Sequence, residues 1–296
     1  TLHFPAWSDL LSGSFVLAVL AAAGKSRRRK GNESDKTLFD KTVHAPPMET
    51  LFLESNVAKF SDLTNFGLNE RDVSVLQEIL LSIFSRYGAE LGQIIRSRWG
   101  LGGDAAVKIE KVNLRGAQSH KFVFEIVVNV KGMKRSLGLR LHTNVSWKNE
   151  IVWANKLHSL TGNEVEYWRF WEIGDSPDQQ AAKKLDIKAL SIGEWVLGED
   201  VYDSDDEALR AVGRTLANSW IMTMRKDGKG GLVGLSIEDR FKWENYLYHP
   251  KDVTATILDF GQAKEIDLRD LNSDTDAFPA LQKGLVMEFQ IRFGAD

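Results

Sequence analysis

A short apolar segment that ends in an acid carries the most chemically informative pattern of the sequence. Ile257-Leu-Asp-Phe-Gly261 has the pattern of a buried strand that ends at Asp259 and is followed closely by a glycine, and Asn245 lies upstream of it. Phosphoryl transfer needs oxygen ligands that hold Mg²⁺ against the phosphates of a nucleotide. Asn245 and Asp259 therefore predict a site for Mg²⁺ and a nucleotide.

The composition is that of an ordinary globular protein and excludes several other chemistries. Of the 296 residues, 43% are hydrophobic and 27% are charged, which argues against global disorder. The formal net charge of −3 gives no overall attraction to nucleic acid, so no nucleic-acid partner is expected. Cysteine is absent, and the 6 histidines never fall at a metal-ligand spacing. Disulfides, cysteine nucleophiles and transition-metal sites are therefore not expected.

The amino-terminal part of the chain has a different pattern from the rest. An apolar run from Leu10 to Gly24 is followed by basic residues between Lys25 and Lys30. The run is shorter than the ~20 residues that span a bilayer, so we expect a buried helix or an interfacial anchor. Its basic residues follow the apolar run, whereas a secretory signal peptide has them before it. A cytoplasmic protein that can contact a membrane surface or a protein through this segment is expected.

The spacing of apolar residues predicts the elements that must position the site. One long helix or two shorter ones are predicted from Asn69 to Trp99. Strict alternation then predicts three antiparallel strands, and later patterns predict a helix, two strands and a second helix. These elements are the strands Val107–Val112, Lys121–Val130 and Ser136–His142, a helix from Ser146 to Leu160, the strands Glu164–Trp171 and Ala189–Val196, and a helix from Asp205 to Arg225.

Two phrases of the sequence resemble the protein-kinase-like superfamily, in which a catalytic loop with Asp and Asn precedes a strand that ends in D-F-G. The phrase Val253-Thr-Ala-Thr-Ile-Leu-Asp-Phe-Gly-Gln-Ala263 is similar to the aminoglycoside and choline phosphotransferase branch. Glu238-Asp-Arg-Phe241 is similar to the D-R-H segment of phosphatidylinositol-kinase-like enzymes. The resemblance implies ATP and Mg²⁺ as cofactors, with Asn245 and Asp259 as the metal ligands.

The same resemblance implies an α+β fold of two lobes. The N-lobe would hold an antiparallel sheet, the small C-lobe would be mainly helical, and a helical extension would precede both. We expect four parts along the chain: an apolar helix with a basic and polar linker at 1–47, a helical extension at 48–103, the N-lobe at 104–192, and the hinge with the C-lobe at 193–296.

The sequence leaves two registers open for the catalytic loop. The usual family spacing back from Asn245 reaches Arg240, which cannot accept a proton, and this register implies a pseudokinase. If the loop holds one extra residue, Asp239 takes the position of the catalytic base, and Lys242 can contact the γ-phosphate. An Asp-Arg start to this loop recurs in atypical kinases, and an inserted loop residue costs little, so Asp239 is favoured.

The third predicted strand would supply contacts to the nucleotide. Alternation places Gly138 and Arg140 on one face, with leucines on the other. By resemblance, Gly138 would lie against the adenine and Arg140 would replace the phosphate-pairing lysine, although Arg and Lys are not equivalent donors. Glu150, early in the following helix, is the expected partner of Arg140, with Glu164 and Glu166 as alternatives.

Two further segments complete the predicted nucleotide site. The turn Leu114-Arg-Gly-Ala-Gln-Ser-His120 would cover the phosphates, with Gly116 as its one glycine. The phrase from Ser191 to Asp200 is similar to the hinge of the phosphotransferase branch. Backbone groups near Glu194 and Val196 would meet the adenine there.

These expectations lead to one favoured function and two alternatives. The favoured function is an atypical kinase that transfers the γ-phosphoryl group of ATP to a hydroxyl of a protein or a small molecule. The first alternative is a pseudokinase or nucleotide-binding scaffold that acts through a protein partner. Transfer of a nucleotidyl group is the second.

Overall fold

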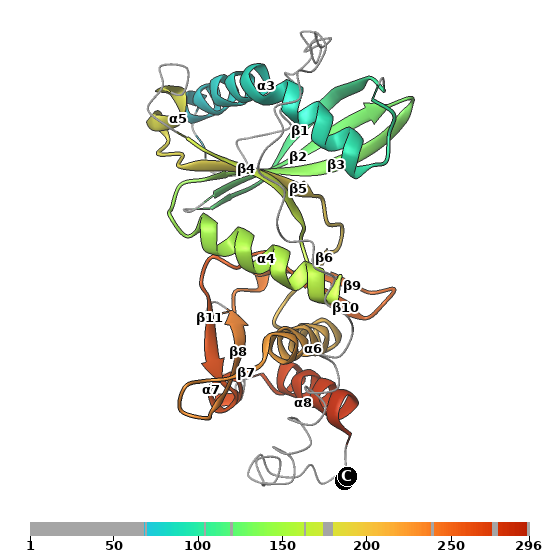
Figure 1. The fold of residues 1–296 in the computed structure, drawn as a ribbon, viewed down its shortest axis with the longest axis vertical. Coiled ribbons are helices and arrows are strands. Elements are labelled where there is room, and N and C mark those ends of the chain that lie inside the picture. The colour runs from blue at the N-terminus through green and yellow to red at the C-terminus, as the bar shows by residue number, and fades with distance from the viewer. Residues whose placement is uncertain are drawn as a thin grey trace.

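The computed structural model describes residues 68, 70–103, 105–118, 121–162, 164–173, 180–237, 240–273 and 278–294. The predicted amino-terminal helix and linker lie outside these residues, as do Glu238 and Asp239. The described chain forms two lobes stacked along the long axis of the molecule, with the sheet of the N-lobe above and the C-lobe below (Figure 1).

The N-lobe is built on a five-stranded antiparallel sheet with the order β1-β2-β3-β5-β4. Alternation along each strand separates an apolar face from a polar one, because successive side chains point to opposite sides. Phe124, Ile126 and Leu139 on the apolar face are fully buried. The strands are β1 (Val107–Gln118), β2 (Lys121–Val130), β3 (Met133–His142), β4 (Tyr167–Glu172) and β5 (Ala189–Glu194).

One long helix, α3 (Glu70–Arg98), covers the apolar face of this sheet (Figure 1). Its apolar stripe, including Leu76, Leu80 and Ile95, is fully buried in a core shared with β1, β2, β3 and β5. Truncating such a leucine to alanine typically costs about 2–5 kcal/mol of stability. The described part of the predicted helical extension, α3, therefore packs as a layer on this sheet.

The opposite face of the sheet looks toward α4 (Trp147–Thr161) and the C-lobe (Figure 1). The helices α6 (Asp206–Thr223) and α8 (Pro279–Phe293) pack closely because glycines lie where they cross. A Cβ on Gly213 would lie 2.0 Å from the carbonyl oxygen of Leu281, and one on Gly284 would lie 1.9 Å from that of Arg210. Larger residues at these two positions would force the helices apart.

Two small antiparallel sheets complete the C-lobe and support the loop that leads to Asp259. Their orders are β10-β9-β6 and β11-β8-β7. The remaining elements are α5 (Gln180–Lys184), β6 (Glu199–Asp200), β7 (Arg225–Lys226), β8 (Leu232–Ile237), the 3₁₀-helix η3 (Trp243–Asn245), β9 (Tyr246–His249), β10 (Thr254–Ile257), β11 (Ala263–Asp267) and α7 (Leu268–Ser273).

The predicted fold class is confirmed, with small differences in the elements. The long helix is continuous, and Asp205 caps α6 by accepting from the backbone N–H groups of Glu207 and Ala208. Several elements of the C-lobe were not predicted, namely α7, α8, β8, β9 and β11. The short helix α5 and the two-residue strands were not predicted either, because segments this short carry too few residues to show a period.

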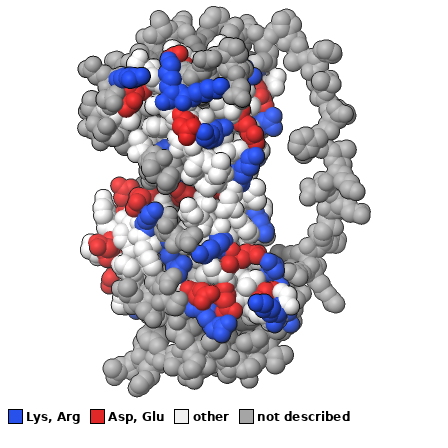
Figure 2. All heavy atoms as spheres, turned by 90° about the vertical axis from the view of Figure 1, so that its left-hand side faces the viewer, with Lys and Arg blue, Asp and Glu red and all other residues white. Residues whose placement is uncertain are grey.

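Charged residues of both signs lie among one another on the face shown in Figure 2, over both lobes. This mixed surface agrees with the small formal net charge of −3. In the described part of the chain, no helix combines the length and the apolar run that crossing a bilayer requires.

Candidate functional site

A cavity of about 780 Å³ lies between the two lobes and brings together distant parts of the sequence. Its apolar walls come from Val123, Val196, Leu247 and Leu258. Its polar lining is formed by Arg115, Lys121, Arg140, Asp200, Glu244, Asn245 and Asp259, with Gly116 and Gly198 among the remaining residues. Both predicted metal ligands and three predicted nucleotide contacts therefore face one cavity.

Asn245 and Asp259 are held next to each other at one end of the cavity. The backbone carbonyl of Asn245, at the end of η3, accepts from the N–H of Leu258 at 2.7 Å. Asp259 Oδ1 accepts from the N–H of Gly261 at 2.8 Å. A Cβ on Gly261 would lie 3.0 Å from Ser146 Oγ and 3.1 Å from Asp259 Oδ1, so a larger residue would disturb the acid.

The segment around Asp259 is also fixed to α4 from the opposite side. Asn149 Nδ2 donates to three backbone carbonyls, those of Phe260 at 3.3 Å, Gly261 at 3.2 Å and Ala263 at 3.0 Å. Just upstream, Glu164 accepts from the N–H of Ile257 at 3.1 Å. Burial raises the pKa of Glu164 to about 8, so this carboxyl group is mainly protonated at neutral pH.

Lys121, the first residue of β2, forms the central ion pairs of the site. Its Nζ lies 3.3 Å from Glu150 Oε1 on α4 and 3.0 Å from Asp259 Oδ2 of the C-lobe. The side chains of Lys121 and Glu150 are 7% and 4% exposed. The predicted pairing of Glu150 with Arg140 is wrong, because Lys121 reaches Glu150 from the neighbouring strand. Glu164 and Glu166 also have other partners, Ile257 and Arg98.

Two further side chains complete the surroundings of Glu150. The hydroxyl of Tyr167 donates to Glu150 Oε1, and burial raises the pKa of Tyr167 well above its ordinary value. His142 Nδ1 lies 3.9 Å from Glu150 Oε2, and its Nε2 is 2.8 Å from Ser191 Oγ. Burial lowers the pKa of His142 to about 4, so the ring is neutral at pH 7. Lys121 thus supplies the positive charge beside Glu150.

Arg140 lies on the predicted face of β3 but in a different environment from Lys121. It is 5% exposed, and its Cζ lies 4.7 Å from the centre of the Tyr167 ring. Its Nη1 has no hydrogen-bond partner among the described residues. A Cβ on Gly138 would lie 3.0 Å from this Nη1 and 3.3 Å from the carbonyl oxygen of Glu194. The guanidinium group therefore lies near the start of the hinge.

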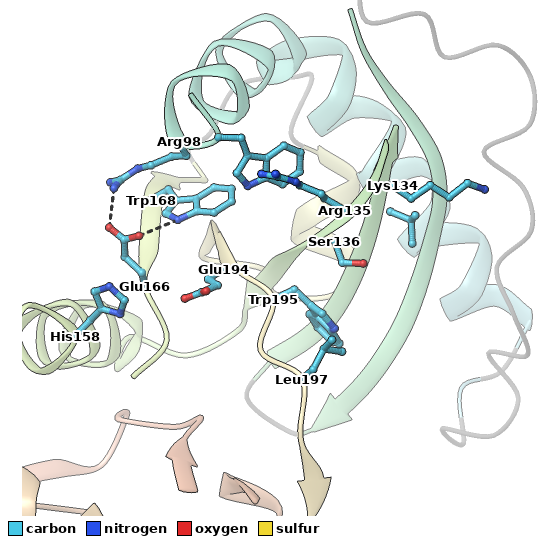
Figure 3. A pocket seen from close by; sticks show the side chains of 12 residues that line it. Arg98, Lys134, Arg135, Ser136, His158, Glu166, Trp168, Glu194, Trp195 and Leu197 are labelled. Atoms are coloured by element: carbon cyan, nitrogen blue, oxygen red, sulfur yellow. Dashed lines mark hydrogen bonds and ion pairs between the residues drawn. The ribbon is translucent and has the colours of Figure 1, made fainter. Parts of the chain in front are cut away.

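The predicted hinge segment also lines a second cavity, of about 640 Å³, through Glu194, Trp195 and Leu197. Figure 3 shows the side chain of Glu194 in this second cavity, together with Arg98, Glu166 and Trp168. Val196 lines the interlobe cavity instead. Of the two predicted hinge residues, only Val196 thus presents its side chain to the cavity of Asp259, and the roles of both backbones stay predictions.

Gly116 lines the interlobe cavity near the end of β1, beside a register shift between Leu114 and Gly116. The tip of the predicted phosphate-covering turn, residues 119 and 120, lies outside the described residues. The neighbouring Arg115 donates through its Nε to Glu125 at 2.9 Å. Burial opposes ionisation of Glu125, but hydrogen bonds from Ser136, Arg115 and Asn113 outweigh it and lower its pKa.

The predicted catalytic loop is described only in part, since Asp239 lies outside the described residues. Arg240 is 4% exposed and turns into the C-lobe, where it donates to Ser236 Oγ and to the carbonyls of Ile237 and Asp270 at 3.3–3.5 Å. Lys242 is exposed and is not among the residues that line the interlobe cavity.

Lys121 is the main residue that the sequence did not reveal. It begins an alternating strand in which most apolar side chains point to the opposite face, and it shares its own face with Val123 and Glu125. This position on the face opposite the core could have identified Lys121 as a candidate site residue. Choosing between Lys121 and Arg140 required the register of β2 against β3, where Lys121 is opposite His142 and Val123 is opposite Arg140.

The sheet order, the helix α4 below the sheet and the ion pairs of Lys121 agree with the two-lobed α+β fold that the sequence predicts. No protein-family model matches the sequence, and no curated protein matches it.

Solved structures that match belong to phosphotransferases and a viral kinase. Aminoglycoside phosphotransferase APH(4)-Ia, in a ternary complex with ADP and hygromycin B, matches with a TM-score of 0.40 and 10% identity over 68% of this chain and 82% of that chain. An aminoglycoside phosphotransferase from Alicyclobacillus acidocaldarius matches with a TM-score of 0.40 and 12% identity, over 62% and 74%. The Cydia pomonella granulovirus kinase PK-1 matches with a TM-score of 0.34 and 16% identity, over 60% and 59%. The function must therefore be argued from the residues of this chain.

Proposed function

We propose that this chain is a kinase-like phosphotransferase that binds Mg²⁺ and a nucleoside triphosphate in the interlobe cavity and transfers the γ-phosphoryl group to a hydroxyl. The observation that carries the proposal is the position of Lys121, whose Nζ is 3.0 Å from Asp259 and 3.3 Å from Glu150. Phosphoryl transfer depends mainly on positioning and on neutralising charge, and a buried ammonium group at the metal-binding end of a cavity serves both.

The donor set at this end of the cavity fits Mg²⁺. Mg²⁺ is usually held by one or two carboxylates together with phosphate oxygens and water, and Asp259 and Asn245 supply one carboxylate and one amide oxygen. When bound, the ion would neutralise phosphate charge and orient the transferred group. The cavity of about 780 Å³ is within the usual range of about 300–1,000 Å³ for small-molecule sites.

Each of the site residues would have a separate role in phosphoryl transfer. Lys121 would share its ammonium donors between Asp259 and phosphate oxygens, while Glu150 keeps its side chain aligned. Asp239 would accept the proton of the attacking hydroxyl, with Lys242 near the γ-phosphate, as the sequence predicts. The inward turn of Arg240 supports the register in which Asp239 takes the base position, because Arg240 is engaged with the carbonyl of Asp270.

The acceptor in this proposal is a hydroxyl of a protein or a small molecule. The proposal requires a nucleoside triphosphate as the donor, and ATP is the donor that the sequence predicts. Contact of the amino-terminal apolar and basic segment with a membrane surface or a protein also stays a prediction. The domain boundaries after residues 47, 103 and 192 also stay a prediction.

A thermal-shift titration tests nucleotide binding. The wild-type chain is titrated with MgATP and separately with MgGTP, beside Asp259→Ala and the surface control Asp252→Ala. A ligand at 100 times its Kd adds about 2.7 kcal/mol of stability, which should raise Tm by roughly 5 °C or more. We expect the shift in the wild type and in Asp252→Ala but not in Asp259→Ala. If neither nucleotide shifts the wild type, the proposed site is wrong. A shift without transfer to any acceptor or to water would instead support a pseudokinase.

A further inference from the structure

Arg140 is a buried cation in the interlobe cavity whose hydrogen-bond donors are not used by the described chain. It is 5% exposed, its Nη1 has no hydrogen-bond partner, and no ion pair joins it to a described residue. A buried charge without hydrogen bonds is costly, so buried cations in proteins are normally paired. The side chain is thus suited to a ligand that supplies the acceptors.

The Tyr167 ring covers one face of the guanidinium group but accepts no hydrogen bond from its in-plane N–H donors. The ring lies 4.7 Å from Arg140 Cζ, a distance at which a guanidinium group stacks favourably on an aromatic face. The five N–H donors of an arginine lie in the plane of the group and point outward from its edge. Stacking on the ring therefore leaves the in-plane donors, including the unpartnered Nη1, for an acceptor at the edge of the group.

The position of Arg140 assigns it to one end of the cavity. A Cβ on Gly138 would come within 3.0 Å of Arg140 Nη1 and 3.3 Å of the hinge carbonyl of Glu194. Lys121, at the other end, is engaged with Asp259 and Glu150. The following step rests on the proposed function: if the phosphates lie at Lys121 and Asp259, the base lies at the hinge end, beside Arg140.

The apolar side chains around this end suit a flat base. Val123 of β2 lines the cavity from the N-lobe, Val196 lines it from the predicted hinge, and Leu247 and Leu258 line it from the C-lobe. A base between these side chains would be covered on both faces, so its edge is what a polar group can recognise. Arg140 is the buried cation at that end.

We propose that the cavity selects a purine with a carbonyl group at C6, guanine or hypoxanthine, over adenine, and that Arg140 reads this edge. Guanine presents two neighbouring acceptors, O6 and N7, which match the two donors of a guanidinium fork. Adenine presents an amino group in place of O6, so a donor would face a donor. We therefore assign Arg140 to the base, whereas the sequence alone assigned it to phosphate.

The test compares four nucleoside diphosphates as their Mg²⁺ complexes, by isothermal titration of the full chain. GDP and IDP carry the C6 carbonyl, and ADP and 2,6-diaminopurine riboside diphosphate carry an amino group there. IDP lacks the 2-amino group of GDP, and the diaminopurine nucleotide has it. The series therefore separates the effect of the C6 substituent from that of the C2 substituent. We expect GDP and IDP to bind at least about tenfold more tightly than the other two, as a bidentate arginine contact provides.

Two arginines of β3 provide a matched pair of variants. Arg140→Met keeps the length of the side chain and removes its donors, so the preference for GDP and IDP should disappear while ADP binds at least as well as before. Arg135 lies on the same strand and also stacks on an aromatic ring, with its Cζ 5.3 Å from the Trp99 ring, but it faces the second cavity (Figure 3). Arg135→Met should keep the preference.

The outcomes distinguish this inference from the proposed function. Equal affinity of the wild type for GDP and ADP, or a preference that survives in Arg140→Met, would overturn the role of Arg140 and leave nucleotide binding intact. If none of the four nucleotides binds, the proposed function fails and the inference with it. The wild-type series gives its answer even if Arg140→Met does not fold.

Discussion

The two ends of the interlobe cavity each contain a buried cation, and the two cations are treated differently by the fold. Lys121 and Arg140 share one face of the sheet and are 6% and 5% exposed. Lys121 is paired with two carboxylates, Glu150 and Asp259. Arg140 lies over an aromatic ring, and its Nη1 has no acceptor among the described residues.

From this difference we assign the Lys121 end to the fold and the Arg140 end to a ligand. The Lys121 end joins β2, α4 and the segment of Asp259, so its charges help to hold the two lobes together. The Arg140 end contributes no such link between described residues. We expect substitutions at the first end to lower both stability and activity, and substitutions at the second end to separate the two.

Removing Lys121 should have the largest effect. Lys121→Met leaves Glu150 and Asp259 without their shared cation, and losing one member of a buried ion pair costs about 3–5 kcal/mol. Phosphoryl transfer should fall by about 10²–10³-fold, as for the loss of one preorganised electrostatic contact. Urea denaturation and steady-state rates measure the two effects. A variant as stable and active as the wild type would contradict the role given to Lys121.

Glu164 is a buried acid that accepts one hydrogen bond from a backbone N–H, and its pKa is raised to about 8. It differs in this from the paired carboxylates at Lys121. In the unfolded chain its pKa is near the ordinary 4.5, so between pH 4.5 and 8 the folded state holds a proton that the unfolded state has lost. Stability is then complete below pH 4.5 and falls as pH rises toward 8, with a slope of up to about 1.4 kcal/mol per pH unit.

The variant Glu164→Gln tests this sign. It keeps an oxygen acceptor for the N–H of Ile257 and cannot ionise, so it should remove this slope and be more stable than the wild type at pH 8. His142 contributes in the opposite sense, but only between its folded pKa of about 4 and its ordinary 6.5. Denaturation midpoints between pH 6.5 and 8 therefore isolate Glu164. Parallel curves for variant and wild type would refute the raised pKa.

Replacing Arg140 should have a smaller effect, of opposite sign to that of Lys121. Arg140→Met removes a buried group with an unsatisfied donor, which costs about 1–3 kcal/mol, and loses a stacking contact worth about 0.5–2 kcal/mol. We expect the nucleotide-free chain to gain about 1 kcal/mol in urea denaturation. A loss as large as that of Lys121→Met would mean that Arg140 supports the fold.

The smallest effect is expected at the surface. Arg225 and Glu265 form an exposed ion pair, and the hydrogen bond between them raises the pKa of Arg225 and lowers that of Glu265. Exposed pairs of this kind contribute little because solvent and salt screen them. Arg225→Ala should leave the urea midpoint unchanged within error. A clear decrease would show that burial does not decide which ion pairs matter in this chain.

The patterns that depend on neighbouring residues in the sequence were the ones that could be predicted. Alternation placed Gly138 and Arg140 on one face of β3, and the helices α3, α4 and α6 and the antiparallel strands of the N-lobe follow from local periods. The proximity of Asn245 to Asp259 was also expected, and the bond between Asn245 and Leu258 provides it.

The partners of the charges could not be predicted, because they depend on register and on the packing of α4. Three cations of the N-lobe line the cavity, Arg115, Lys121 and Arg140, and each has a different environment. The angle of α4 below the sheet decides that Glu150 meets Lys121. No local pattern in the sequence contains that angle.

The most direct test of the central claim measures where the phosphates bind. The affinities of the nucleoside, the monophosphate and the Mg²⁺ complexes of the diphosphate and triphosphate are compared for wild type and Lys121→Met, with guanosine and adenosine series in parallel. We predict that the phosphates add at least about tenfold in affinity in the wild type, as charge-assisted hydrogen bonds do. Lys121→Met should lose this gain while binding the nucleoside as before. If the nucleoside binds as tightly as the triphosphate, or the variant keeps the gain, the phosphates do not lie at Lys121 and Asp259.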